Sequence, residues 1–242
     1  IGDYAFTKCG GIATLDIPAT MTYIGTSAFQ SCNSLKVLSL PDTGLSIGGG
    51  AFSECTGLRT VTLPADYDIK QSPFYNTCGV TTIYYTPGQT GVMMDRESNS
   101  YSVGYNYTLE YYSRNAIETV KFAEGITHIA DYLFYGGYQD GFLAWNRSLK
   151  TVQLPSTVET IGDYAFCLCG ALTDIALGES LTSIGDYAFY ECSNITSLTL
   201  PQSVTSIGNY GFANCGGIPR KLDVPETMTY IGANAFWSCD SL

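Results

Sequence analysis

The stretch that decides the fold runs from Ile184 to Pro201 and reads I-G-D-Y-A-F-Y-E-C-S-N-I-T-S-L-T-L-P. It opens on an Ile-Gly pair, followed by a Phe five residues after the Ile and a Cys eight residues after it. It ends on alternating apolar and polar residues and a Pro. The same order of residues recurs from end to end, so the sequence is that of a repeat protein.

The period is counted most easily on the Ile-Gly pair. The pair recurs in steps of 23 residues from Ile1 to Ile47 and from Ile161 to Ile207, and a last step of 24 leads to Ile231. The Phe of each regular copy stands at Phe6, Phe29, Phe52, Phe166, Phe189, Phe212 and Phe236. The Cys stands at Cys9, Cys32, Cys55, Cys169, Cys192, Cys215 and Cys239. Two degenerate copies fill the middle: Ile69 to Phe74 delays its Cys to Cys78, and Ile129 to Phe134 has none.

Each copy predicts two short extended segments. The first reads L-x-x-I-x-L-P, as in Leu58 to Pro64, and its alternation is typical of a strand with one buried face. Proline ends this strand because it cannot donate to a ladder. The second is the segment before Ile-Gly, as in Val204 to Gly208. Between the Gly and the Cys we expect one tight helical turn, with an Asp or Asn as its N-cap. The cap positions are Asp3, Asp131, Asp163, Asp186 and Asn209.

The unit L-x-x-I-x-L-P-x-x-V-T-x-I-G-x-x-A-F-x-x-C resembles the leucine-rich repeats of the BspA-like bacterial surface proteins. The resemblance covers residues 1–85 and 117–242. It implies a right-handed leucine-rich-repeat solenoid, mostly β with short strands and short helical turns, with about 23 residues per coil. In that family the first strands line the concave face. The resemblance also implies a secreted or surface-attached, extracellular protein, and for some members adhesion to host proteins.

Residues 1–242 are predicted to form a single solenoid, because stacked copies join their apolar faces into one core. Regularity fails in two places, which predict insertions near 86–116 and 135–147. The chain begins and ends inside a repeat, without the polar caps that solenoids need, so we expect it to be part of a longer protein.

The composition excludes several classes of partner. The chain has 22 acidic and 11 basic side chains, a net charge of −11. Nucleic-acid binding needs a basic surface, so it is not expected. The same charge disfavours anionic membrane surfaces and favours a basic partner. No apolar run has the length of a membrane span, so no direct membrane insertion is expected for this fragment.

The cysteine column has two possible structural interpretations, and neither the cysteines nor the single histidine form a recognisable metal-binding pattern. Seven of the nine Cys occupy one repeat position, which fits either a column of buried thiols or a bridge between coils such as Cys169 to Cys192. Cys167 and Cys169 lack a second pair at ligand spacing, and His128 is the only histidine. We therefore predict no metal site and no cofactor.

Three sets of side chains are candidates for binding. The insertions carry aromatic residues of the kind that anchor a protein or a glycan, or that fold back over the irregular coils: Tyr101, Tyr105, Tyr111, Tyr138, Phe142 and Trp145. The outward positions of the first strands form the second set, either a binding face or solubilising decoration: Lys36, Ser39, Arg59, Thr62, Tyr84, Glu118, Lys121, Lys150, Gln153, Asp174 and Thr199. Lys121 and Lys150 stand on adjacent coils there, and with Lys36 and Arg59 they predict a positive face for an acidic partner. The third set is a column that we assign to structure: Tyr132, Tyr164, Tyr187 and Tyr210.

Catalytic motifs are missing from the sequence. His128 has no Ser or Cys partner at a recognisable spacing, and Asp163 and Asp186 repeat for a structural reason, at the cap position. We therefore predict that the chain is not an enzyme. The leading hypothesis is an extracellular or cell-surface recognition and adhesion module that binds a protein such as a host matrix or plasma protein. The alternative is a passive spacer array in a larger surface protein.

Overall fold

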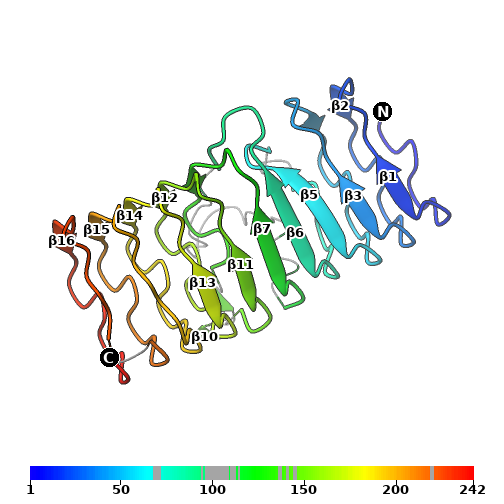
Figure 1. The fold of residues 1–242 in the computed structure, drawn as a ribbon. Helices are drawn as coiled ribbons and strands as arrows, with labels where there is room; N and C mark the ends of the chain where they lie inside the picture. Colours follow the sequence, from blue (N-terminus) through cyan, green and yellow to red (C-terminus); the bar gives the residue numbers. More distant parts are fainter. Residues whose placement is uncertain are drawn as a thin grey trace.

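The computed structural model describes residues 1–67, 72–93, 95, 109, 113, 115–135, 138–139, 142–143, 146–218 and 221–242. The chain winds into coils that stack in one direction, with the two termini at opposite ends of the stack (Figure 1). Short strands repeat at the same two places in successive coils, as the repeat predicts. The solenoid fold is therefore confirmed.

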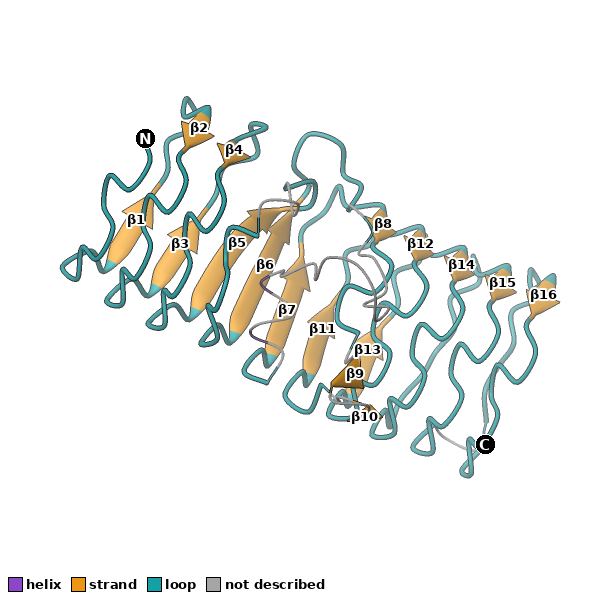
Figure 2. Cartoon of the chain, turned by 180° about the vertical axis from the view of Figure 1, so that it is seen from behind, coloured by secondary structure: helices purple, strands orange, loops and turns teal. Residues whose placement is uncertain are grey.

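Two parallel sheets run along the stack. The long sheet has the order β1-β3-β5-β6-β7-β11-β13 and is built from the first segment of each coil: β1 (Thr14–Asp16), β3 (Val37–Ser39), β5 (Thr60–Pro64), β6 (Thr82–Thr86), β7 (Thr119–Phe122), β11 (Thr151–Gln153) and β13 (Asp174–Ala176). The second segments form another parallel sheet, seen along the upper edge in Figure 2: β8 (His128–Ile129), β12 (Thr160–Ile161), β14 (Ser183–Ile184), β15 (Ser206–Ile207) and β16 (Tyr230–Ile231). The corresponding strands of the first coils, β2 (Tyr23–Ile24) and β4 (Ser46–Ile47), pair with each other.

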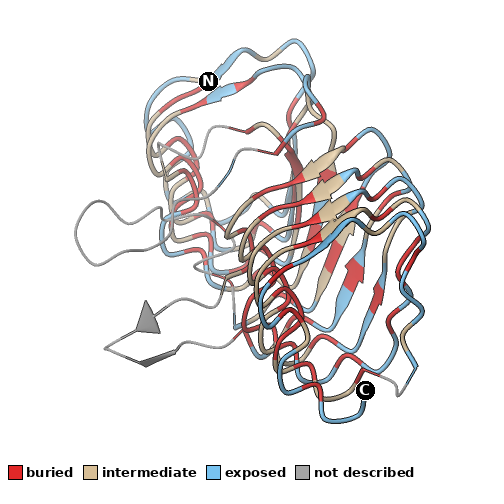
Figure 3. Ribbon diagram, turned by 90° about the vertical axis from the view of Figure 1, so that its left-hand side faces the viewer, coloured by how far each residue is buried: buried red, intermediate tan, exposed pale blue. Residues whose placement is uncertain are grey.

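Neighbouring coils pair in register, which places equivalent side chains in columns. Val61 of β5 lies opposite Leu38 of β3 and Ile83 of β6, and all three are buried. The residues on either side of each point outward. Buried residues alternate with more exposed ones along the strands (Figure 3), so one face of the sheet is core and the other is surface, as the alternating pattern predicts.

The segment between the Gly and the Cys differs from the predicted helical turn. It forms consecutive turns with two positive-φ residues four positions apart, such as Tyr187 at 55° and Glu191 at 60°. The backbone N–H of Tyr187 donates to Asn209 O of the next coil at 2.9 Å, and that of Phe189 donates to Gly211 O at 2.8 Å. In a helical turn these N–H groups would donate to carbonyls of the same coil. Here they join coils, because each coil has a neighbour whose carbonyls lie in register.

The Asp and Asn residues predicted as N-caps also bond across coils. Asp163 Oδ1 accepts the backbone N–H of Asp186 at 2.7 Å, and Asp186 Oδ1 accepts that of Asn209 at 2.6 Å. A Cβ on Gly185 would lie 2.4 Å from Asp163 Oδ1 and 2.7 Å from Asp163 N. Wherever a coil precedes the Ile-Gly pair, as at Gly25, Gly48, Gly162, Gly185, Gly208 and Gly232, the Gly is therefore required by the close approach of that coil.

The core is built from columns of identical residues. The Phe rings stack with 5.0 to 5.9 Å between adjacent centroids along both runs of coils. The Cys side chains beside them are free thiols. Cys192 Sγ donates to Phe166 O of the preceding coil at 3.1 Å, and Cys215 Sγ donates to Phe189 O at the same distance. Of the two open readings of the Cys column, the structure has the buried thiols.

The degenerate coil at Phe74 fills this column with a different residue. Thr77 Oγ1 donates to Phe52 O at 2.8 Å, the bond that a Cys makes elsewhere, while Cys78 is exposed. The Cys is therefore not delayed in this coil but replaced by a hydroxyl. The sequence had one signal for this, since Thr77 stands three residues after Phe74.

The first irregular region keeps more of the repeat than its sequence suggests. β6 pairs with both β5 and β7, although Thr82 and Thr119 are partners 37 residues apart. Val92 forms a parallel bridge with His128, and Asp95 accepts the backbone N–H of Asp131, so Val92 and Asp95 take the places that His128 and Asp131 hold in the next coil. Residues 96–108 follow this segment and lie outside the described residues.

In the second irregular region the chain forms an antiparallel pair, β9 (Tyr138–Gln139) with β10 (Phe142–Leu143). Across the part of the chain that the structure describes, no helix has the length and apolar character needed to cross a membrane.

Candidate functional site

The outer face of the long sheet is the first candidate, and we call it the sheet face. It consists of two rows of side chains in register across the central strands. The first row is formed by threonines on four neighbouring strands: Thr60, Thr82, Thr119 and Thr151. The second row is more varied: Thr62, Tyr84, Lys121 and Gln153. Hydroxyl, phenol, ammonium and amide groups thus stand side by side on a rigid support.

Tyr84 and Lys121 form the centre of the sheet face. Lys121 Nζ lies 5.7 Å from the centroid of the Tyr84 ring, and the Tyr84 side chain remains exposed. The ammonium is attracted to the negative face of the ring, which fixes both groups on the sheet. A contact of this kind holds an aromatic anchor ready without burying it.

Two of the other predicted cations of this face, Lys150 and Arg59, have partners of their own. Lys150 Nζ lies 3.6 Å from Glu118 Oε2, with both side chains more than half exposed. Arg59 Nη1 donates to the backbone carbonyls of Thr56 and Leu58, each at 2.9 Å. Lys121 is in register with Gln153, so Lys121 and Lys150 lie on adjacent coils but in different rows. With Glu118 and Asp174 on the same face, the sheet face carries charges of both signs.

The predicted insertion aromatics are placed as follows. Tyr101, Tyr105, Tyr111 and Trp145 lie outside the described residues. Tyr138 belongs to β9 and Phe142 to β10, and only the backbone pairing of these strands is described. Whether the insertions bind a partner stays a prediction.

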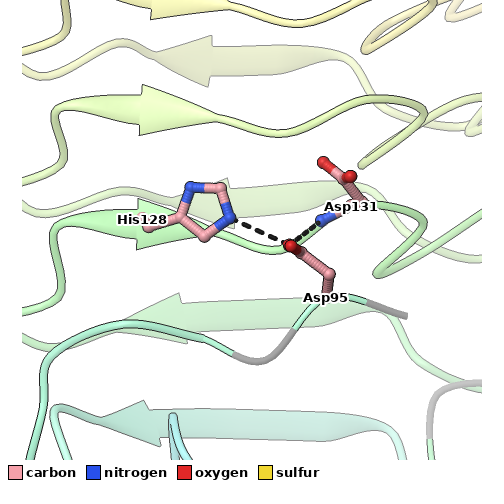
Figure 4. Close-up of side chains that lie close together, drawn as sticks. All are labelled: Asp95, His128 and Asp131. Carbon is pink, nitrogen blue, oxygen red and sulfur yellow. Dashed lines mark hydrogen bonds and ion pairs between the residues drawn. The ribbon is translucent and has the colours of Figure 1, made fainter. Parts of the chain in front are cut away.

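A second candidate lies where the first irregular region rejoins the stack. Asp95, His128 and Asp131 have ligand atoms within 4.8 Å of one another (Figure 4). His128 Nε2 lies 3.0 Å from Asp95 Oδ1, and Nδ1 lies 2.7 Å from Thr160 Oγ1 of the next coil. The two bonds hold the imidazole ring across three coils. No sequence pattern connects Asp95 with His128, since 33 residues separate them.

The Asp95–His128–Asp131 group has enough ligand atoms to bind one divalent cation. However, its carboxylate oxygens already accept hydrogen bonds that join neighbouring coils. Asp95 Oδ1 accepts the backbone N–H of Asp131 at 3.0 Å, and Asp131 Oδ1 accepts that of Asp163 at 2.7 Å. Burial raises the pKa of the Asp131 carboxyl. The hydrogen bond from the Asp163 backbone N–H lowers this pKa, and the negative charges of Asp95 and Asp163 raise it. Asp95 thus extends the column of inter-coil acceptors by one coil.

The buried thiols are not set up for chemistry. Burial raises the pKa of the Cys55 thiol from 9.0 to about 12, and it also raises the pKa of Cys169, Cys192 and Cys215. A reactive cysteine needs a lowered pKa and access to solvent. These residues have neither, so they are part of the core.

The comparisons with known proteins agree with this architecture. The family model for the BspA-type leucine-rich repeat region matches residues 1–95 and 106–242, in six copies. The chain belongs to this family. Repeat solenoids of this kind are typical of non-enzymatic proteins, and leucine-rich repeat proteins generally bind other proteins.

Solved structures with a similar fold come from bacteria. A leucine-rich repeat protein from Bacteroides ovatus is 22% identical, with a TM-score of 0.48, over 100% of this chain and 68% of that chain. A leucine-rich cell surface protein from Faecalibacterium prausnitzii is 24% identical, with a TM-score of 0.40, over 100% of this chain and 62% of that chain. The pneumococcal vaccine antigen PcpA is 20% identical, with a TM-score of 0.45, over 93% of this chain and 55% of that chain. Among curated proteins none matches the sequence.

Proposed function

We propose that this chain is a non-enzymatic recognition module at a bacterial cell surface, which binds a protein partner through the sheet face. The observation that carries the proposal is the exposed Tyr84 held beside Lys121 in the middle of a rigid parallel sheet. Aromatic residues with two rotatable side-chain bonds make effective anchors, because little conformational entropy is lost when they bind. The surrounding threonines add hydroxyl groups that donate and accept hydrogen bonds.

The family supports the location and the class of partner. One similar structure is described as a cell surface protein and another as a vaccine antigen, both of which fit a module exposed outside the cell. The finer proposal, binding to a host matrix or plasma protein, rests on the resemblance to surface proteins that adhere. A glycan is a second ligand class to include in the test, because exposed tyrosines also contact sugars.

The test is a binding screen of the chain against matrix proteins, plasma proteins and a glycan panel. A Tyr84→Ala/Lys121→Ala variant runs beside it, with Glu179→Ala/Gln202→Ala as a matched control at two exposed positions away from the sheet face. For a hot spot we expect the first variant to bind at least about tenfold more weakly, and the control to bind as the native chain does.

A third variant separates the sheet face from the insertions. It shortens residues 96–112 and replaces 136–145 with a regular turn. Loss of binding in this variant alone would move the site to the insertions. Failure of the native chain to bind any member of the panel would leave the passive spacer as the better description.

A further inference from the structure

A second surface of the solenoid has the character of a binding face, although it lies on the turns. Tyr164, Tyr187 and Tyr210 stack with 4.8 Å between adjacent ring centroids and interplanar angles of 8° and 11°. Tyr190 packs across them at 62° to Tyr187 and 73° to Tyr210. All four side chains are half-buried, so part of each ring reaches solvent. We call this set the tyrosine face.

Carboxylates border the tyrosine face. Burial raises the pKa of the Tyr187 hydroxyl, and the neighbouring Tyr210 and Asp186 raise it further. Burial also raises the pKa of the Tyr190 hydroxyl, and the charge of Glu191 raises it further. Glu191 Oε1 accepts a hydrogen bond from Asn214 Nδ2 at 3.0 Å, and the same amide donates to the Tyr190 hydroxyl at 3.3 Å. Phenols and carboxylates therefore form one connected surface.

This surface lies in the part of the chain that has no positive side chain. Residues 151–218 contain six carboxylates and no Lys, Arg or His: Glu159, Asp163, Asp174, Glu179, Asp186 and Glu191. Among the described residues, the ion pairs join His128 to Asp95, Lys150 to Glu118 and Lys221 to Asp223. None of the carboxylates of the tyrosine face is neutralised by a cation from the described part of the chain.

The tyrosines are not needed to form the coil. In the N-terminal coils the equivalent positions hold Tyr4, Ser27 and Gly50, and Ser27 and Gly50 keep the same positive φ, 50° and 63°. The N–H of Ser27 still donates to Gly49 O of the next coil, at 3.0 Å. Since serine and glycine suffice for the backbone, the tyrosines supply something beyond the fold.

We propose that the tyrosine face docks a basic, arginine-rich extended segment of a protein partner. A guanidinium group offers several donors in one plane, so it can bond a carboxylate and a phenol oxygen together and lie against an aromatic ring. The uncompensated negative charge would attract such a segment and speed its association. Tyr and Arg are also the residues that most often dominate the binding energy of interfaces.

The test uses fluorescence anisotropy with a short labelled peptide of alternating Arg and Gly, and a peptide of alternating Glu and Gly as a negative control. The variant Tyr190→Ser/Glu191→Gln removes one ring and one charge from the tyrosine face. The matched control is Tyr75→Ser/Glu54→Gln, because Tyr75 and Glu54 occupy the same two repeat positions in coils away from the tyrosine face. Both variants lower the negative charge of the chain equally, and thermal unfolding verifies that both are folded.

We expect the native chain to bind the Arg-Gly peptide at physiological salt, the Tyr190→Ser/Glu191→Gln variant to bind it about tenfold more weakly, and the control to bind as the native chain does. Tyr187→Phe, which keeps the stack and removes one hydroxyl, should weaken binding by a smaller factor. Equal weakening in both double variants, or no binding by the native chain, would overturn the proposal. The Tyr84→Ala/Lys121→Ala variant should bind the peptide normally, so the result is separate from that for the sheet face.

Discussion

The N-terminal coils, residues 1–67, and the C-terminal coils, residues 146–218, share their inner columns and differ in their outer ones. Phe29 and Phe189 are both fully buried and both stack on the Phe of the next coil. Outside, Ser27 stands where the C-terminal coils have Tyr187. Evolution of a repeat can vary outer positions at little cost to stability, because they do not decide how coils stack. The outer differences are therefore where function should be sought.

The largest effect should come from the Phe column, and it should be the same in both regions. Phe29→Ala and Phe189→Ala each remove a fully buried ring and leave a cavity that the stacked neighbours cannot fill. We expect each to lower the free energy of unfolding by about 3 to 5 kcal/mol, measured by chemical denaturation. Phe6→Ala is the control, because Phe6 is 41% exposed and should cost less. A loss confined to one region would show that the inner columns are not equivalent.

The next effect should come from the Gly of the Ile-Gly pair. A Cβ on Gly48 would lie 2.5 Å from Thr26 N, and one on Gly185 would lie 2.4 Å from Asp163 Oδ1. Gly48→Ala and Gly185→Ala should each cost about 1 to 3 kcal/mol, because a coil must shift to admit the methyl group. Gly216→Ala serves as the control, since nothing lies within 4 Å of its added Cβ. Equal midpoints of unfolding for Gly185→Ala and Gly216→Ala would contradict the close approach.

A smaller effect should distinguish the two substitutions Cys192→Thr and Cys192→Val. Threonine keeps a donor for Phe166 O, as Thr77 does for Phe52 O at 2.8 Å, whereas valine has a similar shape and no donor. We expect valine to be less stable than threonine by about 1 kcal/mol in thermal unfolding, the contribution of one hydrogen bond. A more stable valine variant would show that the thiol serves only to fill space.

The smallest effect should be found at the outer ion pair. Lys150 and Glu118 are 58% and 56% exposed, so solvent and salt screen their attraction. Lys150→Gln should change the free energy of unfolding by less than about 0.5 kcal/mol, in contrast to every inner-column variant. A Glu118→Gln/Lys150→Gln double variant measures the coupling between the two. A coupling comparable with the loss from Phe189→Ala would remove the distinction between inner and outer columns.

Much of the architecture could be predicted from local patterns. The alternation in Leu58 to Pro64 predicted the strand β5 (Thr60–Pro64), and the regular spacing of the Phe and Cys residues predicted the stacked core columns. The turns were predicted as helical because Asp followed by Tyr, Ala and Phe reads as a cap and the start of a helix. The donors of that segment instead bond the next coil, about 23 residues away in sequence, which no local pattern records.

The candidate sites were less accessible from the sequence. Val92 to Asp95 was not recognised as a coil segment, because it lacks the Ile-Gly pair and precedes an insertion. Its contact with His128 therefore became visible only in three dimensions. Tyr84 and Lys121 were both identified as outward residues, but their contact depends on the pairing of β6 with β7 across a break in the period.

The sequence by itself determined the repeat, the identity of the core columns and the acidic character of the chain. These follow from residue type and spacing, because every coil buries its own apolar residues against an equivalent neighbour. The tertiary structure alone decided that each turn segment has two left-handed residues four positions apart, that the Asp column joins coils and that tyrosines and carboxylates share one face. Each of these depends on which coil lies beside which, and that order is fixed by backbone hydrogen bonds between coils.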